Sequence, residues 1–205
     1  MLINRITGLD IKEFIQNWDN PQSYRNTINH EAKKSIIGNI NNTGDPASAA
    51  APVVTRYHPE FFSFVEEGVL DLVKLVIHNL NYITFLSCQG HPAYYANHKL
   101  IELRPRQVSI LPRNEGEAEE IWLLFHKTCQ KTNKAIRTDK LLTKVEKQRL
   151  EIFNKEYTRY WMTISLTFEP LDCTSEAYFK DLEEVYRSFL RHLSTTTEHP
   201  AIPTN

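Results

Sequence analysis

The chain has 205 residues, 41% of them hydrophobic and 11% aromatic, so it can form one domain with a substantial core but not two large ones. Its 24 Lys and Arg residues nearly balance 25 Asp and Glu residues, which excludes a strong overall electrostatic attraction to nucleic acid or to an anionic membrane. Met1 is followed by polar residues and the most apolar stretch (69–86) contains charges, so neither a signal peptide nor a membrane span is expected. The three cysteines are widely spaced, which predicts no disulfides. The sequence therefore predicts a soluble, cytoplasmic protein.

The N-terminal part is predicted to be helical. Asp10 and Glu13 have the spacing of a capping box, which predicts a short helix to Trp18. Asn20 and Pro21 then predict a second helix that fades near Gly38. The chain is therefore divided into four parts: an N-terminal helical segment (1–38), a flexible linker rich in Asn, Gly, Ser and Ala (39–54), an α/β domain of catalytic type (55–194) and a disordered tail (195–205).

The first half of this domain is predicted to hold one helix and three strands. Apolar residues at helical spacing predict a helix from Glu60 to about Asn79. The β-forming run 82–86 predicts a buried strand. Alternation predicts two further strands, 100–103 and 108–111, which are expected to pair as a hairpin.

The second half is predicted to alternate helices with one long strand. A capping box at Asn114 and Glu117 predicts a helix to about Thr132, and a second helix is expected over 141–153. Strict alternation over 160–168 predicts a strand, and the run 174–193 predicts the last helix. The expected fold is α+β (or α/β), with a small mixed sheet of about four strands and helices packed on it.

Candidate chemistry centres on the turn Ser87-Cys88-Gln89-Gly90-His91, directly after the predicted strand 82–86. Strand ends are common ligand sites in such folds, and Gly90 permits backbone conformations that other residues resist. Cys88 is a candidate nucleophile that His91 activates, because a thiolate attacks where a thiol does not. The sequence assigns no third residue to orient the histidine.

Three other interpretations of the turn remain open. Cys88 and His91 have a spacing that can place two ligands on one zinc ion. The residues that would have to complete the site are His58, His98, Cys129 or Cys173. Because these form no second closely spaced pair, zinc is not expected. The turn could also cradle an anion or nucleotide with its backbone amides. A buried, inert cysteine is the purely structural interpretation.

Two basic regions add candidate binding sites. Arg104, Arg106 and Arg113 could form an anion-binding edge beside the turn. The region 127–155 is rich in Lys and Arg and is followed by Tyr157, so it could bind RNA or an acidic protein instead of forming a solvated surface.

The order of elements around the turn resembles a known family. The run Val65 to Val73, the strand from Asn81 to Phe85 and the turn 87–91 resemble the opening of the tRNA wybutosine-synthesis methyltransferases, which carry a Ser-Cys-x-Gly-Arg turn there. Uncharacterised bacterial and phage proteins with Ser-Cys-x-Gly-His are more similar still. The resemblance covers Glu60 to Leu111 and implies a mixed α/β fold, a turn that lines a cleft, and S-adenosylmethionine with tRNA as substrates. His91 stands where that family has Arg.

The sequence thus predicts an enzyme whose reactive pair is Cys88 and His91. The residues predicted to bind substrate are Ser87, Gln89, Gly90, Tyr94, Arg104 and Arg106. Two reaction classes are expected, either cysteine-nucleophile acyl or amide chemistry, or group transfer to RNA or a nucleotide. The alternative is a non-catalytic RNA- or protein-binding module that uses the region 127–155.

Overall fold

The computed structural model describes residues 4–7, 11–22, 33–35, 38–40, 54–96, 99–154 and 157–197. In chain order the elements are β1 (Asn4–Thr7), α1 (Ile11–Trp18), β2 (Lys33–Ser35), β3 (Gly38–Ile40), α2 (Phe61–Phe64), α3 (Glu67–Lys74), the π-helical turn η2 (Leu75–Asn79), β4 (Ile83–Cys88), β5 (Tyr94–Ala96), β6 (Lys99–Ile101), β7 (Arg106–Leu111), α4 (Glu115–Ala135), β8 (Leu141–Asn154), β9 (Tyr157–Pro170) and α5 (Ser175–Thr197).

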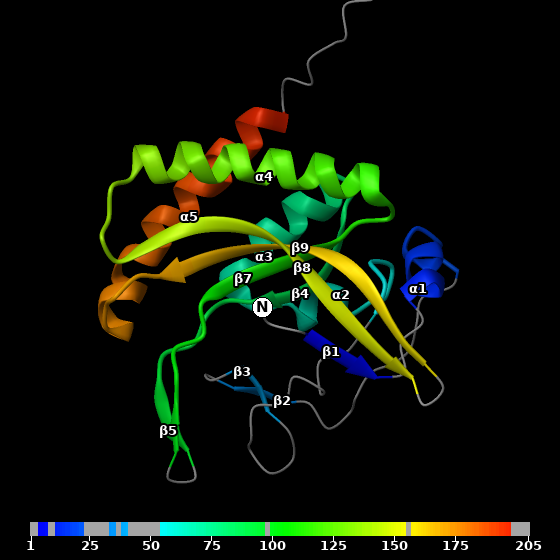
Figure 1. Ribbon diagram of the computed structural model, residues 1–205, viewed down its shortest axis with the longest axis horizontal. Helices are drawn as coiled ribbons and strands as arrows, with labels where there is room; N and C mark the ends of the chain where they lie inside the picture. The colour runs from blue at the N-terminus through cyan, green and yellow to red at the C-terminus, as the bar shows by residue number, and fades with distance from the viewer. Residues whose placement is uncertain are drawn as a thin grey trace, which may run out of the picture.

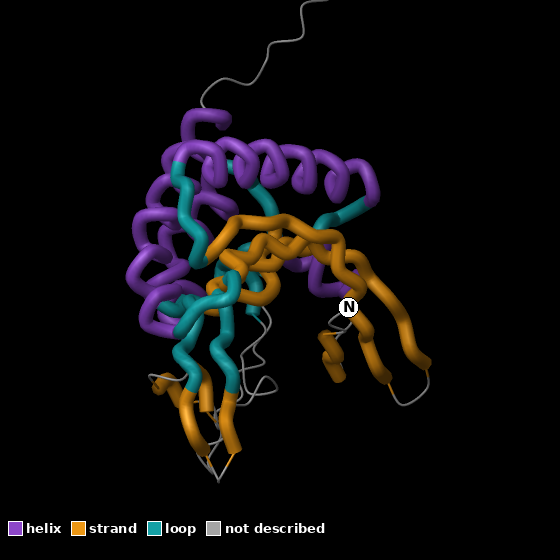
Figure 2. The backbone as a smooth tube through the Cα atoms, turned by 60° about the vertical axis from the view of Figure 1, so that its left-hand side comes forward, coloured by secondary structure: helices purple, strands orange, loops and turns teal. Residues whose placement is uncertain are grey.

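A five-stranded sheet of order β1-β8-β9-β7-β4 forms the centre of the fold. Four of its strands, β4, β7, β9 and β8, are antiparallel neighbours, and β1 adds in parallel to β8. Helices α4 and α5 cover one face, while the ribbon β5–β6 extends away from the sheet (Figures 1 and 2). The expected α+β fold with helices packed on a small sheet is confirmed.

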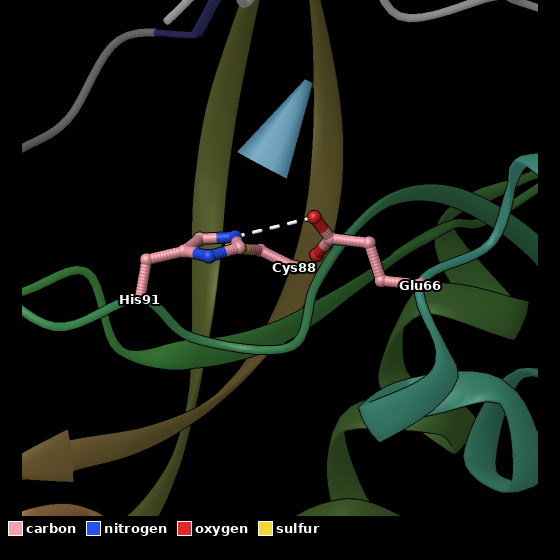
Figure 3. Close-up of side chains that lie close together, drawn as sticks. All are labelled: Glu66, Cys88 and His91. Atoms are coloured by element: carbon pink, nitrogen blue, oxygen red, sulfur yellow. Dashed lines mark ion pairs between the residues drawn. The ribbon is translucent and has the colours of Figure 1, made fainter. Parts of the chain in front are cut away.

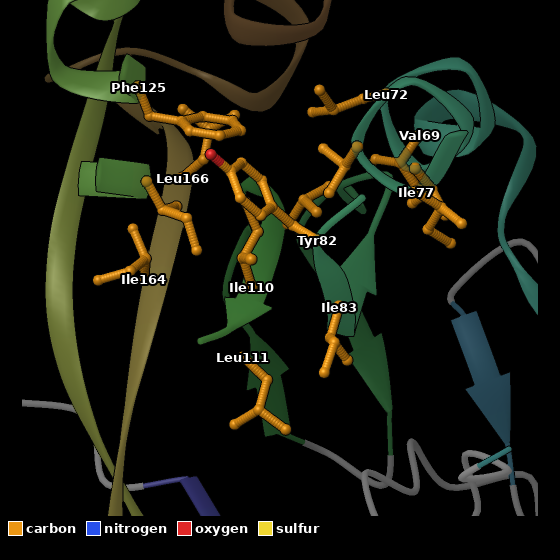
Figure 4. Close-up of a cluster of buried hydrophobic side chains, with 14 of the residues drawn as sticks. Val69, Leu72, Ile77, Tyr82, Ile83, Ile110, Leu111, Phe125, Ile164 and Leu166 are labelled. Carbon is orange, nitrogen blue, oxygen red and sulfur yellow. The ribbon is translucent and has the colours of Figure 1, made fainter. Parts of the chain in front are cut away.

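The main core lies between this sheet and the helices (Figure 4). Phe125 of α4 and Phe189 of α5 are fully buried, with ring centroids 6.0 Å apart. Leu72 of α3 and the strand residues Ile110 and Leu166 are equally buried. Each such side chain stabilises the fold by about 1.5–3 kcal/mol, so the sheet is a rigid base for the loops at its edges.

Helix α1 packs into the same core. Trp18 is fully buried, and its ring centroid lies 5.7 Å from that of Phe61. Phe14 meets Phe85 of β4 edge-to-face, with centroids 6.0 Å apart. The predicted helix to Trp18 is confirmed over its described residues, and its apolar face contacts the domain that carries the turn.

Several predicted elements differ from the structure. The helix expected over 60–79 is interrupted, because Val65 and Glu66 are extended between α2 and α3. The expected hairpin is wrong: β6 pairs with β5, whereas β7 pairs with β4 and β9. The second N-terminal helix is wrong where it can be judged, since 33–35 and 38–40 form a small antiparallel pair.

The helix expected over 141–153 is also wrong, since this segment is strand β8. Charged side chains hide its alternation, and its stability comes from pairing with β9 from Leu141–Pro170 to Asn154–Tyr157. Pairing with a distant partner overrides local preference in such cases. The strand over 160–168 and the helices that begin at Glu115 and near Thr174 are confirmed.

Most of the predicted linker and tail, 41–53 and 198–205, lies outside the described residues. Helix α5 continues to Thr197, past the predicted start of the tail. Within the described segments, no helix has both the length and the apolar content needed to cross a membrane.

Candidate active site

The turn after β4 is fixed by the backbone on both sides. β4 ends at Cys88, and His91 then exchanges two backbone hydrogen bonds of 2.9 Å with Arg104. Gly90 between them has a φ of 89°, in the left-handed region that favours glycine. A Cβ at this position would lie 3.1 Å from the backbone nitrogen of Arg106. The glycine therefore allows the turn to approach β7 closely and presents Cys88 and His91 together.

The interruption between α2 and α3 brings a third residue to the turn. Because Glu66 is extended and precedes the first turn of α3, its carboxylate reaches the end of β4. Glu66 Oε2 accepts a 2.7 Å hydrogen bond from the Gln89 amide, and Gln89 Oε1 accepts one of 3.1 Å from the Gly68 amide. This reciprocal pair of bonds joins the start of α3 to the turn and orients the Glu66 side chain.

Glu66, Cys88 and His91 converge at this point (Figure 3). His91 Nε2 lies 3.2 Å from Glu66 Oε1. One nitrogen of His91, the Cys88 sulfur and one Glu66 oxygen all lie within 4.8 Å of one another. The His91 side chain is 1% exposed and that of Glu66 14%, so the contact is largely shielded from water. The arrangement places a carboxylate beside His91, where the sequence assigned no third residue.

The electrostatics of the group favour charged side chains. Burial alone opposes the charge on His91, but hydrogen bonds to Cys88 and Glu66 and the charges of both raise the pKa of His91 to about 9. Burial also opposes the charge on Glu66, yet hydrogen bonds from His91 and the Gln89 amide and the charges of His91 and Arg104 hold the pKa of Glu66 below its usual 4.5. At neutral pH the site therefore contains an imidazolium and a carboxylate.

Of the three predicted anion-binding arginines, Arg113 pairs with Asp19 and Glu117, and the other two have different surroundings. Arg106 is buried; its Nη2 lies 2.6 Å from Glu183, its Nε donates to the Gln89 carbonyl, and its guanidinium lies 4.4 Å above the Tyr186 ring. Those contacts tie the turn to α5. Arg104 lies near enough to Glu66 for its charge to lower the pKa of that carboxyl. Arg104 thus contributes positive charge next to the Glu66 carboxylate.

The other predicted residues lie around the turn. Ser87 pairs with Val108, so strand alternation places it on the face opposite to Cys88. Gln89 and Gly90 shape the turn as described above, and Tyr94 is half-buried at the start of β5. The structure therefore groups Cys88 and His91 directly and places Gln89 and Gly90 as their backbone support.

A polar strip beside Cys88 was not anticipated from the sequence. Gln107 is the register partner of Cys88, and directly opposed residues share a face of the sheet. Its Nε2 donates to Ser165 Oγ at 2.7 Å and to Ser109 Oγ at 3.2 Å. The only sequence signal was the alternation of polar residues in β7. Cys88 therefore lies beside a row of polar side chains that are hydrogen-bonded to one another.

The remaining candidate ligands lie elsewhere. The carbonyl of Cys129 accepts from Thr143, and Cys173 Sγ donates to the Lys140 carbonyl. His58 Nδ1 accepts from the Glu60 amide, and His98 lies outside the described residues. In the part of the chain that the structure describes, Glu66, Cys88 and His91 are the grouped residues that could hold a metal ion.

The basic region 127–155 is divided between the end of α4 and β8. Lys144 pairs with Glu146 and Glu169, and Lys147 contacts Glu119. On β8 these acidic partners offset part of the positive charge.

No protein-family model, curated protein or solved structure matches this chain in the three comparisons made.

Proposed function

We propose that the protein is an enzyme of acyl or amide chemistry in which Cys88 is the nucleophile. The observation that carries the proposal is the position of Glu66, which forms an ion pair with a buried histidine beside the cysteine. A nucleophile, a base and a group that orients the base constitute the arrangement that activates cysteine and serine in unrelated folds. His91 is then the base and Glu66 the positioning residue.

The reaction would proceed in two steps. The Cys88 thiolate attacks the carbonyl carbon, the leaving amine or alcohol takes a proton from the His91 imidazolium, and a thioester forms. Water then attacks the thioester while His91 accepts a proton from it, which releases the acid and restores the Cys88 thiolate and the His91 imidazolium. The pair gives up one proton to the leaving group in the first step and regains one from water in the second, and Glu66 stabilises the imidazolium whenever it is present.

Substrate recognition would use the groups around the turn. Arg104 would hold an anionic group of a small molecule or nucleotide, since guanidinium matches carboxylate and phosphate oxygens. The amides of Gln89 and His91 already donate to Glu66 and to the Arg104 carbonyl, so oxyanion stabilisation would need other donors. All three cysteines are free thiols, which supports a reducing compartment such as the cytosol.

Trapping of an acyl-enzyme tests this proposal. The protein is incubated with p-nitrophenyl acetate, quenched in acid and examined by intact-mass and peptide mass spectrometry. Acetylation is expected on Cys88, with a burst of nitrophenol that is lost in Cys88→Ala and reduced at least about 100-fold in His91→Gln, in line with general-base contributions. Cys173→Ser is the matched control. Acetylation confined to lysines or Cys173 would overturn the proposal.

Group transfer to RNA with S-adenosylmethionine, which the family resemblance implies, remains a prediction. Binding of this cofactor would raise the melting temperature at saturating concentration, because a ligand that binds only the folded state stabilises it.

A further inference from the structure

Three side chains of the site supply different donor atoms from two separate segments. Cys88 offers a thiolate, His91 an imidazole nitrogen and Glu66 a carboxylate oxygen, all within 4.8 Å of one another. In a tetrahedral zinc site, metal–ligand bonds of about 2.0–2.3 Å place the ligand atoms roughly 3.5 Å apart. The 3.2 Å between His91 Nε2 and Glu66 Oε1 matches that spacing.

The surroundings hold these donors in position. The second oxygen of Glu66 accepts from the Gln89 amide, which leaves the first oxygen directed at His91. His91 is fixed through its backbone pair with Arg104 and is almost fully buried. Hydrogen bonds of this kind orient ligands in metal sites and strengthen binding. Little movement of the side chains is therefore needed to bind an ion, and His91 would release its proton as the ion binds.

The donor set favours zinc over harder cations. A thiolate and an imidazole are ligands that zinc prefers, whereas Mg²⁺ and Ca²⁺ require mainly oxygen ligands. Three protein ligands leave the fourth position of a tetrahedral ion to water. The charge of Arg104, close to Glu66, opposes a cation at this point and should make binding reversible.

We propose that Glu66, Cys88 and His91 bind one zinc ion and that this binding reversibly blocks the cysteine. Binding itself depends only on the geometry, whereas the inhibition rests on the proposed function of Cys88 as a nucleophile. A zinc-bound thiolate shares its electron pair with the metal, and the same ion is also coordinated by the imidazole and the carboxylate. The nucleophile, the base and the carboxylate that positions the base are then all unavailable for the reaction.

Cobalt and zinc titrations of metal-free protein test the site directly. Co²⁺ should bind one equivalent and give a thiolate-to-metal absorption band, and Zn²⁺ should displace it. Cys88→Ser should abolish the band, and Glu66→Gln should weaken binding at least tenfold, while the matched controls Glu67→Gln and Cys173→Ser should bind as wild type. Circular dichroism of each variant confirms folding. Absence of the band in folded wild-type protein, or its persistence in Cys88→Ser, would overturn the site.

Alkylation separates this inference from the proposed function. Stoichiometric Zn²⁺ should slow iodoacetamide modification of Cys88 at least tenfold, and excess EDTA should restore the rate. If Cys88 is highly reactive but unaffected by Zn²⁺, the metal inference fails and the nucleophile stands. If Zn²⁺ binds with Cys88 dependence to a protein whose three cysteines react equally slowly, the nucleophile fails and the zinc site stands without its inhibitory role.

Discussion

Replacement of Glu66 by Gln should change how stability depends on pH, because this carboxylate supports the charge of His91. In the folded protein the pKa of His91 is raised from 6.5 to about 9. The folded state therefore holds this proton more tightly than the unfolded chain. One pKa unit corresponds to about 1.4 kcal/mol, so the charged histidine contributes up to about 3 kcal/mol.

The sign follows from proton linkage. Because the folded pKa is higher, the contribution is complete below pH 6.5 and is lost as the pH rises from 6.5 through about 9. Glu66→Gln removes one of the two partners of His91 and leaves Cys88. The variant should therefore be less stable than wild type by about 1–2 kcal/mol near pH 6, and the difference should shrink toward pH 9.

Urea unfolding of EDTA-treated protein, followed by tryptophan fluorescence at several pH values, measures this difference. Glu67→Gln, which alters the neighbouring exposed carboxylate, is the control and should give a difference that is independent of pH. A Glu66→Gln penalty of the same size at pH 6 and pH 9.5 would refute the account of the ion pair. On the acid side, the lowered pKa of Glu66 predicts a loss of stability as the pH falls below 4.5.

Three further variants test the structure around the site and anion binding beside it. Gly90→Ala should cost about 1–3 kcal/mol of unfolding free energy, because it places a side chain at positive φ against the Arg106 backbone; an unchanged urea midpoint would contradict the described turn. Tyr178→Phe should cost a similar amount, since the Tyr178 hydroxyl donates to the Phe168 carbonyl at 2.8 Å and accepts from the Arg106 amide at 2.9 Å, and both groups are buried; a neutral effect in thermal unfolding would argue against that bridge. Arg104→Gln should reduce the rate of Cys88 alkylation by anionic iodoacetate more than that by neutral iodoacetamide; equal effects on both reagents would exclude anion binding by this arginine.

Much of the fold could be predicted where the signal is local. The Asn114 side chain caps α4 by accepting from the Glu117 amide at 2.9 Å, as its spacing predicts. The alternation of β9 is equally local. Strand β8 could not be recognised, because its stability comes from register with β9 and from a core contact of Thr143 with α4, not from its own composition. Alternation also could not show which partner β6 takes, and β6 pairs with β5.

The site was only half visible in the sequence. Cys88 and His91 share one turn, so their spacing alone brings them together. Glu66 belongs to a run with helical periodicity, and its role depends on a break that periodicity does not show. The available signal was Gly68, a poor helix residue whose added Cβ would lie 2.9 Å from Gln89 Cβ. Which partners an arginine would take also depends on the fold, as Arg106 and Glu183 illustrate.

The rate of alkylation of each cysteine tests the central claim most directly. Metal-free protein is treated with limiting iodoacetamide at pH 7, and modification of Cys88, Cys129 and Cys173 is followed by peptide mass spectrometry. The account predicts that Cys88 reacts at least tenfold faster than Cys173 and loses this advantage in His91→Gln, because the imidazolium stabilises the thiolate. Equal, slow modification of Cys88 and Cys173, or an unchanged rate in folded His91→Gln, would contradict it.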